Sequence, residues 1–190
     1  MIATLRMATA ATAAATVAAG NTTQTSLDAV MALLAAQRHA HAHFTQQQWL
    51  ALLDRPLRST GELRYDAPDQ LEQRILTPKP EILRYDGGEV SVQRGRHSYR
   101  IDAQRYPQLL PLLEGLRATL SGDLGRLQHN FRLQFQGGIR HWQLDLAPID
   151  AAAAAAVRSV RIDGEEAQLR RIEVRQANGD HSVMLIEPAP

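Results

Sequence analysis

Apolar and polar residues alternate along much of this chain, a pattern typical of strands that bury one face. Between residues 61 and 101 the alternation predicts four short strands in succession, interrupted by turn-forming prolines and glycines. Gly87-Gly88 tolerates the positive φ angles of a tight hairpin turn, so the strands on either side of it are expected to be antiparallel. The stretch therefore predicts an antiparallel meander with one apolar face.

Three segments have the spacing of helices instead. After a capping Thr25 or Ser26, apolar residues recur at the i, i+3, i+4 and i+7 positions of one helical face: Leu27, Val30, Met31 and Leu34. A second helical segment is expected to begin near Arg105 and to carry a stripe of leucines that extends to Leu120. Asp150 can cap the third, the alanine run Ala151–Ala156.

The rest of the chain returns to alternation. Strands are expected at residues 131–136, 141–146, 160–162, 169–175 and 182–187, with turns at Gly137-Gly138, Asp163-Gly164 and Asn178-Gly179. In all, the pattern indicates about ten strands and three helical segments. The predicted fold class is therefore α+β: one strongly curved antiparallel sheet, an incomplete β-barrel, with helices covering its concave face.

Composition narrows the classes of function. The 190 residues are 44% hydrophobic, enough for a single domain with a substantial core. The 21 basic residues against 20 acidic ones give a net charge of +1, so no basic surface for a nucleic acid is expected. Cysteine is absent, which excludes disulfides, thiolate catalysis and cysteine metal sites.

The N-terminal residues have the order of a secretory signal peptide. Arg6 supplies a positive charge, residues 7–19 are an uncharged run rich in alanine, and Ala18-Ala19-Gly20 supplies the small residues that precede cleavage. The run is shorter than the about 20 apolar residues that a membrane-spanning helix needs. Residues 1–20 are therefore predicted to be a signal peptide, and residues 21–190 a single exported domain.

The sequence offers little that could perform catalysis. It contains no nucleophile-elbow, phosphate-loop or zinc-protease motif. His39, His41 and His43 would share one strand face and could form a surface metal site. A solvated strand face is the favoured interpretation, because no carboxylate or fourth ligand is near in sequence. We expect no metal, no cofactor and no enzymatic activity, and hence a binding protein.

Residues 41–87 hold a series of short motifs. They are, in order, His41-Ala-His-Phe-Thr-Gln-Gln47, Ser59-Thr-Gly-Glu-Leu-Arg-Tyr65, Ala67-Pro68 followed by Leu71, and Pro80-Glu-Ile-Leu83 followed by Asp86-Gly87. By their order and spacing, rather than by any single motif, this stretch resembles the outer-membrane lipoprotein carrier (LolA) family.

The resemblance implies a periplasmic protein whose incomplete β-barrel, covered by helices, shields the acyl chains of a lipoprotein or related lipid. It also implies an inner-membrane ABC-type transporter as donor and an outer-membrane acceptor. A monomer is expected. Two alternatives stay open: a carrier of a non-lipoprotein acylated or lipid molecule, and an envelope-stress-type sensor or interaction domain with the same fold.

A carrier of this kind needs apolar walls and an apolar lid, since each methylene group of the acyl chain that is buried against them contributes about 0.8 kcal/mol to the free energy of binding. Candidate wall residues lie on the apolar faces of the predicted strands: Leu63, Tyr65, Leu71, Ile75, Leu83, Tyr85, Val90, Val92, Phe131, Leu133, Trp142 and Leu144. Candidate lid residues are the helical leucines Leu109, Leu112, Leu113 and Leu116. Residue by residue, an ordinary core position is an equally good interpretation.

The chain departs from the family pattern at Ala67. Well-known carriers of the family have an arginine there, which links barrel and lid. A link between barrel and lid in this chain is therefore absent or built from other residues.

Overall fold

The computed structural model describes residues 11–101 and 109–189, with side chains for residues 23–101 and 110–189. The first ten residues of the predicted signal peptide and the predicted helix start near Arg105 lie outside the described residues. Within the part of the chain that the structure describes, none of the helices has the length and apolarity required to span a bilayer.

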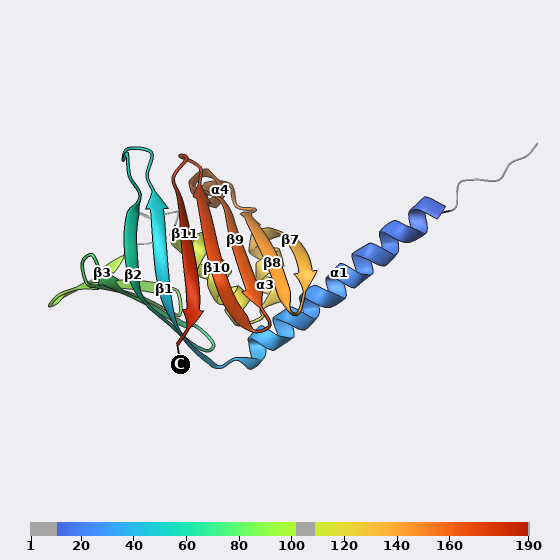
Figure 1. Cartoon of the computed structure of the whole chain (residues 1–190), viewed down its shortest axis with the longest axis horizontal. Coiled ribbons are helices and arrows are strands. Elements are labelled where there is room, and N and C mark those ends of the chain that lie inside the picture. Colours follow the sequence, from blue (N-terminus) through green and yellow to red (C-terminus); the bar gives the residue numbers. More distant parts are fainter. Residues whose placement is uncertain (1–10, 102–108, 190) are drawn as a thin grey trace, which may run out of the picture.

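Eleven strands form one antiparallel sheet (Figure 1). They are β1 (His39–Trp49), β2 (Leu57–Asp66), β3 (Gln70–Thr77), β4 (Glu81–Asp86), β5 (Glu89–Arg94), β6 (His97–Ile101), β7 (Phe131–Gly138), β8 (His141–Pro148), β9 (Val157–Glu165), β10 (Gln168–Gln176) and β11 (His181–Pro188). The prediction of four strands between residues 61 and 101 is wrong by one, because the short β6 also pairs with its neighbour β5.

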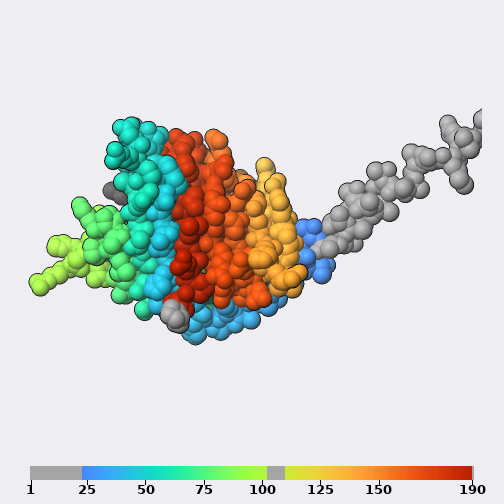
Figure 2. Space-filling model, in the orientation of Figure 1, coloured from blue at the N-terminus to red at the C-terminus, as the bar shows by residue number. Residues whose placement is uncertain are grey.

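The sheet joins the two ends of the chain. Its strand order is β6-β5-β4-β3-β2-β1-β11-β10-β9-β8-β7, so the meanders β1–β6 and β7–β11 meet where β1 pairs with β11. In Figure 2 the first strand lies directly beside the last on the outer face of the sheet. The pairing places Phe44 opposite Ile186, and both side chains are buried. The order is linear, so the sheet is open, with β6 and β7 at its edges.

Helices cover the concave face of the sheet (Figure 1). These are α2 (Leu109–Leu120), α3 (Leu124–Asn130) and the C-terminal part of α1 (Ala11–Ala36), whose N-terminal part extends away from the sheet, while α4 (Ala151–Ala156) connects β8 to β9. Asp150 caps α4 as predicted, because its side chain accepts a hydrogen bond from the backbone N–H of Ala153 at 2.8 Å. The separate α3 makes the prediction of three helical segments wrong by one among the described residues. The predicted fold class is confirmed.

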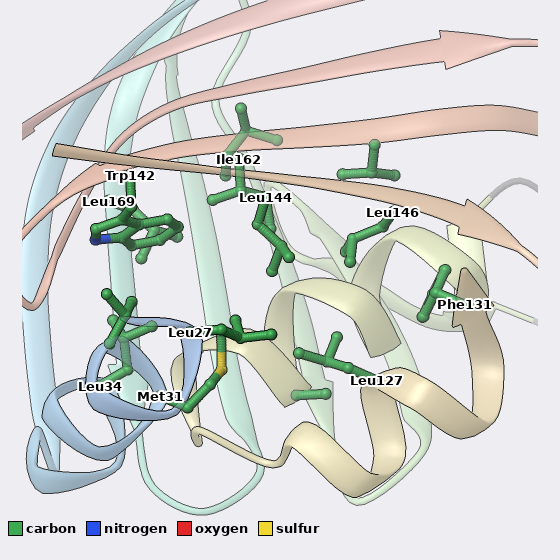
Figure 3. Close-up of a cluster of buried hydrophobic side chains, with 14 of the residues drawn as sticks. Leu27, Met31, Leu34, Leu127, Phe131, Trp142, Leu144, Leu146, Ile162 and Leu169 are labelled. Carbon is green, nitrogen blue, oxygen red and sulfur yellow. The ribbon is translucent and has the colours of Figure 1, made fainter. Parts of the chain in front are cut away.

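The larger of two cores lies between α1, α3 and the strands β7 to β11 (Figure 3). The predicted stripe of α1 is buried in full: Leu27, Val30, Met31 and Leu34. It packs with Leu127 of α3 and with inward side chains of the sheet such as Trp142 and Leu144. Burying one such side chain contributes roughly 1.5–3 kcal/mol. Apolar packing therefore holds α1 and α3 against this half of the sheet.

The smaller core lies in the other half of the sheet. Tyr65, Leu71, Tyr85 and Val90 of β2 to β5 pack there with Leu113 of α2. The two halves of the sheet thus have separate cores, and α2 takes part in both, since Leu113 belongs to the smaller core and Ala118 to the larger one.

Two predicted turns lie inside strands. Gly164 belongs to β9, and the turn follows at Glu166, which adopts a φ of 51°. Glycine is needed at position 164 for close packing rather than for a turn, since a Cβ there would lie 2.1 Å from a ring carbon of Trp142. Gly137-Gly138 likewise ends β7, and the turn falls at residues 139–140. The other two predicted turns are confirmed by positive φ angles at Gly87, Gly88 and Gly179.

Replacement of Gly164 by alanine tests this packing. The added methyl group would force the Trp142 indole away from its place in the core, which is overpacking of the kind that costs about 1–3 kcal/mol. We expect the free energy of unfolding, measured by urea titration, to fall by that amount. Gly138→Ala is the matched control, because nothing lies within 4 Å of a Cβ there. Equal stability of the two variants would contradict the explanation.

Candidate functional site

A cavity of about 340 Å³ lies under the pairing of β1 and β11, between the two cores. Its lining is mainly aliphatic: Ala40, Ala42, Leu63, Leu71, Leu83, Leu169, Ile172, Val174, Met184 and Ile186 from the sheet, and Leu112, Leu113, Leu116 and Leu120 from α2. Polar residues such as Gln37, Gln168 and Ser182 also line it. The volume is within the range of about 300–1,000 Å³ that is typical of small-molecule sites.

The structure brings together some of the residues predicted from the sequence. Four wall candidates and three lid candidates line the cavity: Leu63, Tyr65, Leu71, Leu83, Leu112, Leu113 and Leu116. The remaining wall candidates lie elsewhere, with Tyr85 and Val90 in the smaller core, Val92 buried, Phe131, Trp142, Leu144 and Leu133 in or against the larger core, and Ile75 half-buried. Leu109 begins α2, but its side chain lies outside the described residues.

Sequence reasoning missed the part of the lining that comes from β1, β10 and β11. Ala40 and Ala42 alternate with the histidines of β1 and line the cavity. This alternation predicts a strand, but it does not indicate which other strands pair with it. Ile172 and Met184 face each other across β10 and β11 in the same way. Ala42 pairs with Leu63 between β1 and β2, and the pairing of β1 with β11 adds Met184 and Ile172 to the same lining. No local pattern in the sequence indicates the pairing of β1 with β11.

One side of α2 carries a buried polar group. The side chain of Arg117 is only 6% exposed, and its Nη1 donates to Oδ1 of Asp69 at 2.5 Å. Its Nη2 donates to Oε2 of Glu114 at 3.3 Å. Burial would lower the pKa of Arg117, but the charges of Glu114 and Asp69 outweigh it and raise that pKa. The guanidinium is therefore held in its charged form.

Tyr85 of β4 extends the group into the sheet. Its hydroxyl donates to Oε1 of Glu114, and Nη1 of Arg126 lies 3.5 Å from the other carboxylate oxygen. Burial, and then the hydrogen bond and charge of Glu114, raise the pKa of Tyr85 to about 12. We call Asp69, Tyr85, Glu114 and Arg117 the polar cluster. It fixes α2 to the β2–β3 turn and to β4.

Comparison with known proteins identifies the family. The family model described as outer membrane lipoprotein carrier protein LolA-like matches residues 19–189. This chain belongs to that family. A search of curated proteins found no match.

Solved structures resemble this LolA-like chain at low sequence identity. A DUF1329 family protein from Desulfovibrio piger is 9% identical with a TM-score of 0.50, and the match covers 87% of this chain and 91% of that one. A LolA superfamily protein from Nitrosomonas europaea is 10% identical with a TM-score of 0.49, covering 88% and 94%. Lipoprotein LppX from Mycobacterium tuberculosis is 15% identical with a TM-score of 0.40, covering 87% and 97%. At such identities the likeness concerns the fold alone.

The polar cluster bears on the departure from the LolA family at Ala67. Ala67 packs against the smaller core, and its backbone N–H donates to the carbonyl of Arg38 at 2.9 Å. Asp69, two residues later in the same turn, binds Arg117 of the covering helix. Helix and sheet are therefore linked here with the cation on the helix and the carboxylate on the turn.

The three histidines of β1 lie on the exposed outer face of the sheet. Nδ1 of His39 is 2.6 Å from Oδ1 of Asp66, and Nε2 of His41 is 3.7 Å from Oε2 of Glu62. Strand pairing thus supplies carboxylates that the sequence order does not show. Among the described residues, however, no three histidine or carboxylate side chains gather in a way that could hold a metal ion.

Asp69→Ala tests the attachment of α2. The variant leaves the buried Arg117 with Glu114 as its partner, and hydrogen bonds to charged groups contribute about 1.5–3 kcal/mol. Because Asp69 is 41% exposed, solvent screens part of this, and we expect a loss of about 1–2 kcal/mol in unfolding free energy. Amide hydrogens of α2 should also exchange faster.

Asp66→Ala is the control for that experiment. It removes the more exposed pair with His39, and such surface pairs contribute about 0–1 kcal/mol. If α2 exchanges equally fast in both variants, the ion pair of Arg117 does not hold the helix.

The raised pKa of Tyr85 predicts a pH dependence. The protonated phenol is favoured in the folded state, so its contribution to stability is complete below the ordinary pKa of 10.0 and is lost as pH rises toward about 12. We expect wild type to be more stable than Tyr85→Phe at pH 9, and this difference to shrink by pH 11.5. The measurement is urea unfolding at each pH. A difference that is constant over this range would contradict the prediction.

Proposed function

We propose that this chain is a periplasmic carrier that shields the acyl chain of a lipoprotein or a related lipid during transfer from the inner to the outer membrane. The observation that supports it most is the cavity of about 340 Å³ between the two cores, with aliphatic walls and a leucine-bearing helix across it. Membership of the LolA-like family supports the same proposal.

The size of the cavity suits an acyl chain. An apolar cavity of about 150 Å³ binds benzene, so a space about twice as large accommodates on the order of a dozen carbon atoms. At about 0.8 kcal/mol for each buried methylene, such a chain gains on the order of 9 kcal/mol before the costs of binding. That is sufficient for holding an acyl chain, and transfer requires no bond to be broken. The carrier function therefore needs no catalytic residue.

The volume also bears on which cargo is carried. A space for about a dozen carbon atoms accommodates one acyl chain rather than several. A lipid or protein with a single chain in the cavity is the cargo that fits the structure best. This favours a carrier over an interaction domain, which has no need of an internal cavity.

The remaining parts of the proposal follow from the sequence and the family. Residues 1–20 would direct export, and residues 21–190 would act as one domain in the periplasm. The four buried residues of the α1 stripe lie after residue 20, so cleavage there would leave all four in the mature chain. An inner-membrane ABC-type transporter and an outer-membrane acceptor would be the partners.

Ala42→Phe tests the carrier proposal. Ala42 lies in β1 and lines the cavity, so a phenyl ring there would occupy space needed by the ligand. Displacement of only two methylenes costs about 1.6 kcal/mol, so we expect the affinity for a fluorescent fatty acid to fall at least tenfold. The measurement is a fluorescence titration. Ala152→Phe, on the exposed helix α4, is the matched control and should bind like wild type.

Two outcomes would contradict the proposal. One is that the wild-type protein does not bind the fluorescent fatty acid. The other is that protein purified from its native envelope contains no lipid or acylated protein by mass spectrometry. Either result would leave the interaction domain as the better interpretation.

A further inference from the structure

Three large apolar side chains are exposed close together where β1 connects to β2. Leu52 is 97% exposed, Leu53 47% and Leu57 50%. Single exposed leucines are common on soluble proteins, whereas a group of them marks a surface that contacts another apolar phase. The connection projects beyond the end of the sheet (Figure 1), and Figure 2 shows it as a protruding lobe. We call residues 49–58 the apolar hairpin.

The apolar hairpin is held in shape at its base. The backbone N–H of Ala51 donates to Oδ1 of Asp180, in the turn between β10 and β11, at 2.8 Å. The indole of Trp49 stacks on the ring of His181, with the ring centres 4.5 Å apart and the planes 5° from parallel. These contacts fix the base of the hairpin to the neighbouring turn, while the leucines beyond it stay exposed. Their exposure is therefore a feature of an anchored structure.

The apolar hairpin also carries an excess of positive charge. Arg55 and Arg58 are both exposed, and Asp54 is the one acidic residue between positions 49 and 58. Neither arginine has an ion-pair partner among the described residues. Apolar side chains flanked by exposed basic residues are typical of segments that lie at a membrane surface, because the headgroups attract the cations and the acyl region accepts the apolar groups.

The size and shape of the hairpin favour a membrane over a protein partner. A stable protein interface takes about 20–30 residues and about 800 Å² from each partner. The lobe of residues 49–58 offers fewer residues, and it protrudes instead of forming a broad surface (Figure 2). A lipid bilayer requires no complementary shape, since each leucine that enters it gains free energy by itself.

We propose that the apolar hairpin docks this chain on an anionic lipid surface, with its three leucines at the boundary of headgroups and acyl chains and its two arginines facing the phosphate groups. This goes beyond the proposed carrier function, because it places the protein itself in contact with a membrane. The leucines and arginines of the hairpin are distinct from the residues that line the cavity. Membrane docking and ligand binding can therefore be tested separately.

Leu52→Ser is the variant that tests the docking, because it removes the apolar side chain at the tip without disturbing either core. Binding to vesicles of phosphatidylethanolamine and phosphatidylglycerol is measured by co-sedimentation. We expect the affinity to fall roughly 10- to 100-fold, since the burial of one leucine side chain is lost. Leu185→Ser is the matched control: Leu185 is 51% exposed on β11, and this variant should bind vesicles like wild type.

Arg55→Gln and Arg58→Gln test the contribution of charge. Each should lower the affinity for the vesicles that contain phosphatidylglycerol about fivefold, which is the contribution of one basic residue near an anionic surface. The affinity for vesicles of phosphatidylcholine alone should stay unchanged. An equal loss on both kinds of vesicle would contradict the assignment of the arginines to anionic headgroups.

Leu52→Trp gives a readout that does not depend on a loss of binding. Tryptophan is favoured at the membrane–water interface, so this variant should bind vesicles at least as well as Leu52→Ser does not. Its fluorescence emission should move to shorter wavelength when vesicles are added, by more than the emission of wild type, which has Trp49 and Trp142 only. No difference from wild type would mean that the tip stays in water.

The outcomes separate this inference from the carrier proposal. If wild type does not bind the vesicles, or if Leu52→Ser binds them as well as Leu185→Ser does, the docking is overturned, and the leucines are left for a protein partner. Leu52→Ser should bind the fluorescent fatty acid like wild type, because Leu52 does not line the cavity. If wild type binds vesicles but no fatty acid, the carrier proposal fails and the docking stands.

Discussion

The pairing of β1 with β11 is the constraint on which the rest of the structure depends. It makes neighbours of the first and last strands, so β6 and β7 become the two edges of one open sheet. The chain between those edges, which includes α2 and α3, then connects them across the concave face (Figure 1). The position of the covering helix is thus a consequence of strand order. The covering helix also buries apolar side chains that an open sheet would otherwise expose.

The same pairing explains why space remains under the middle of the sheet. The two cores share the helix α2, but they are separated where β1 presents the small side chains of Ala40 and Ala42 to the cavity. Phe44, further along the same strand, fills its surroundings and is buried. An empty apolar space lowers stability relative to a filled one. The small side chains of Ala40 and Ala42 are therefore explained if a ligand fills the cavity for part of the time.

Local patterns in the sequence predicted the strands, the α1 stripe and the Asp150 cap, because alternation and capping depend on residues close together in the chain. They also placed Leu63 and Tyr65 on an inward face. They did not show that Ile172 and Met184 would join these residues, since that depends on which strands pair. The link between Asp69 and Arg117 joins residues 48 positions apart. Gly164 was wrongly predicted to lie in a turn, because its actual role, close packing against Trp142, depends on a residue that is distant in the sequence.

The two main helices are held to the sheet in different ways, and the difference suits a carrier. The buried apolar stripe of α1 packs in the larger core. In α2, Leu113 enters the smaller core, while Leu116 and Leu120 line the cavity and Arg117 binds Asp69. A buried ion pair adds little net stability after desolvation, but it fixes orientation. The helix can therefore keep its place over the cavity while its leucines remain available to a ligand. Because a ligand that packs on those leucines stabilises the covering helix through the free energy of binding, occupancy of the cavity and the position of α2 are coupled.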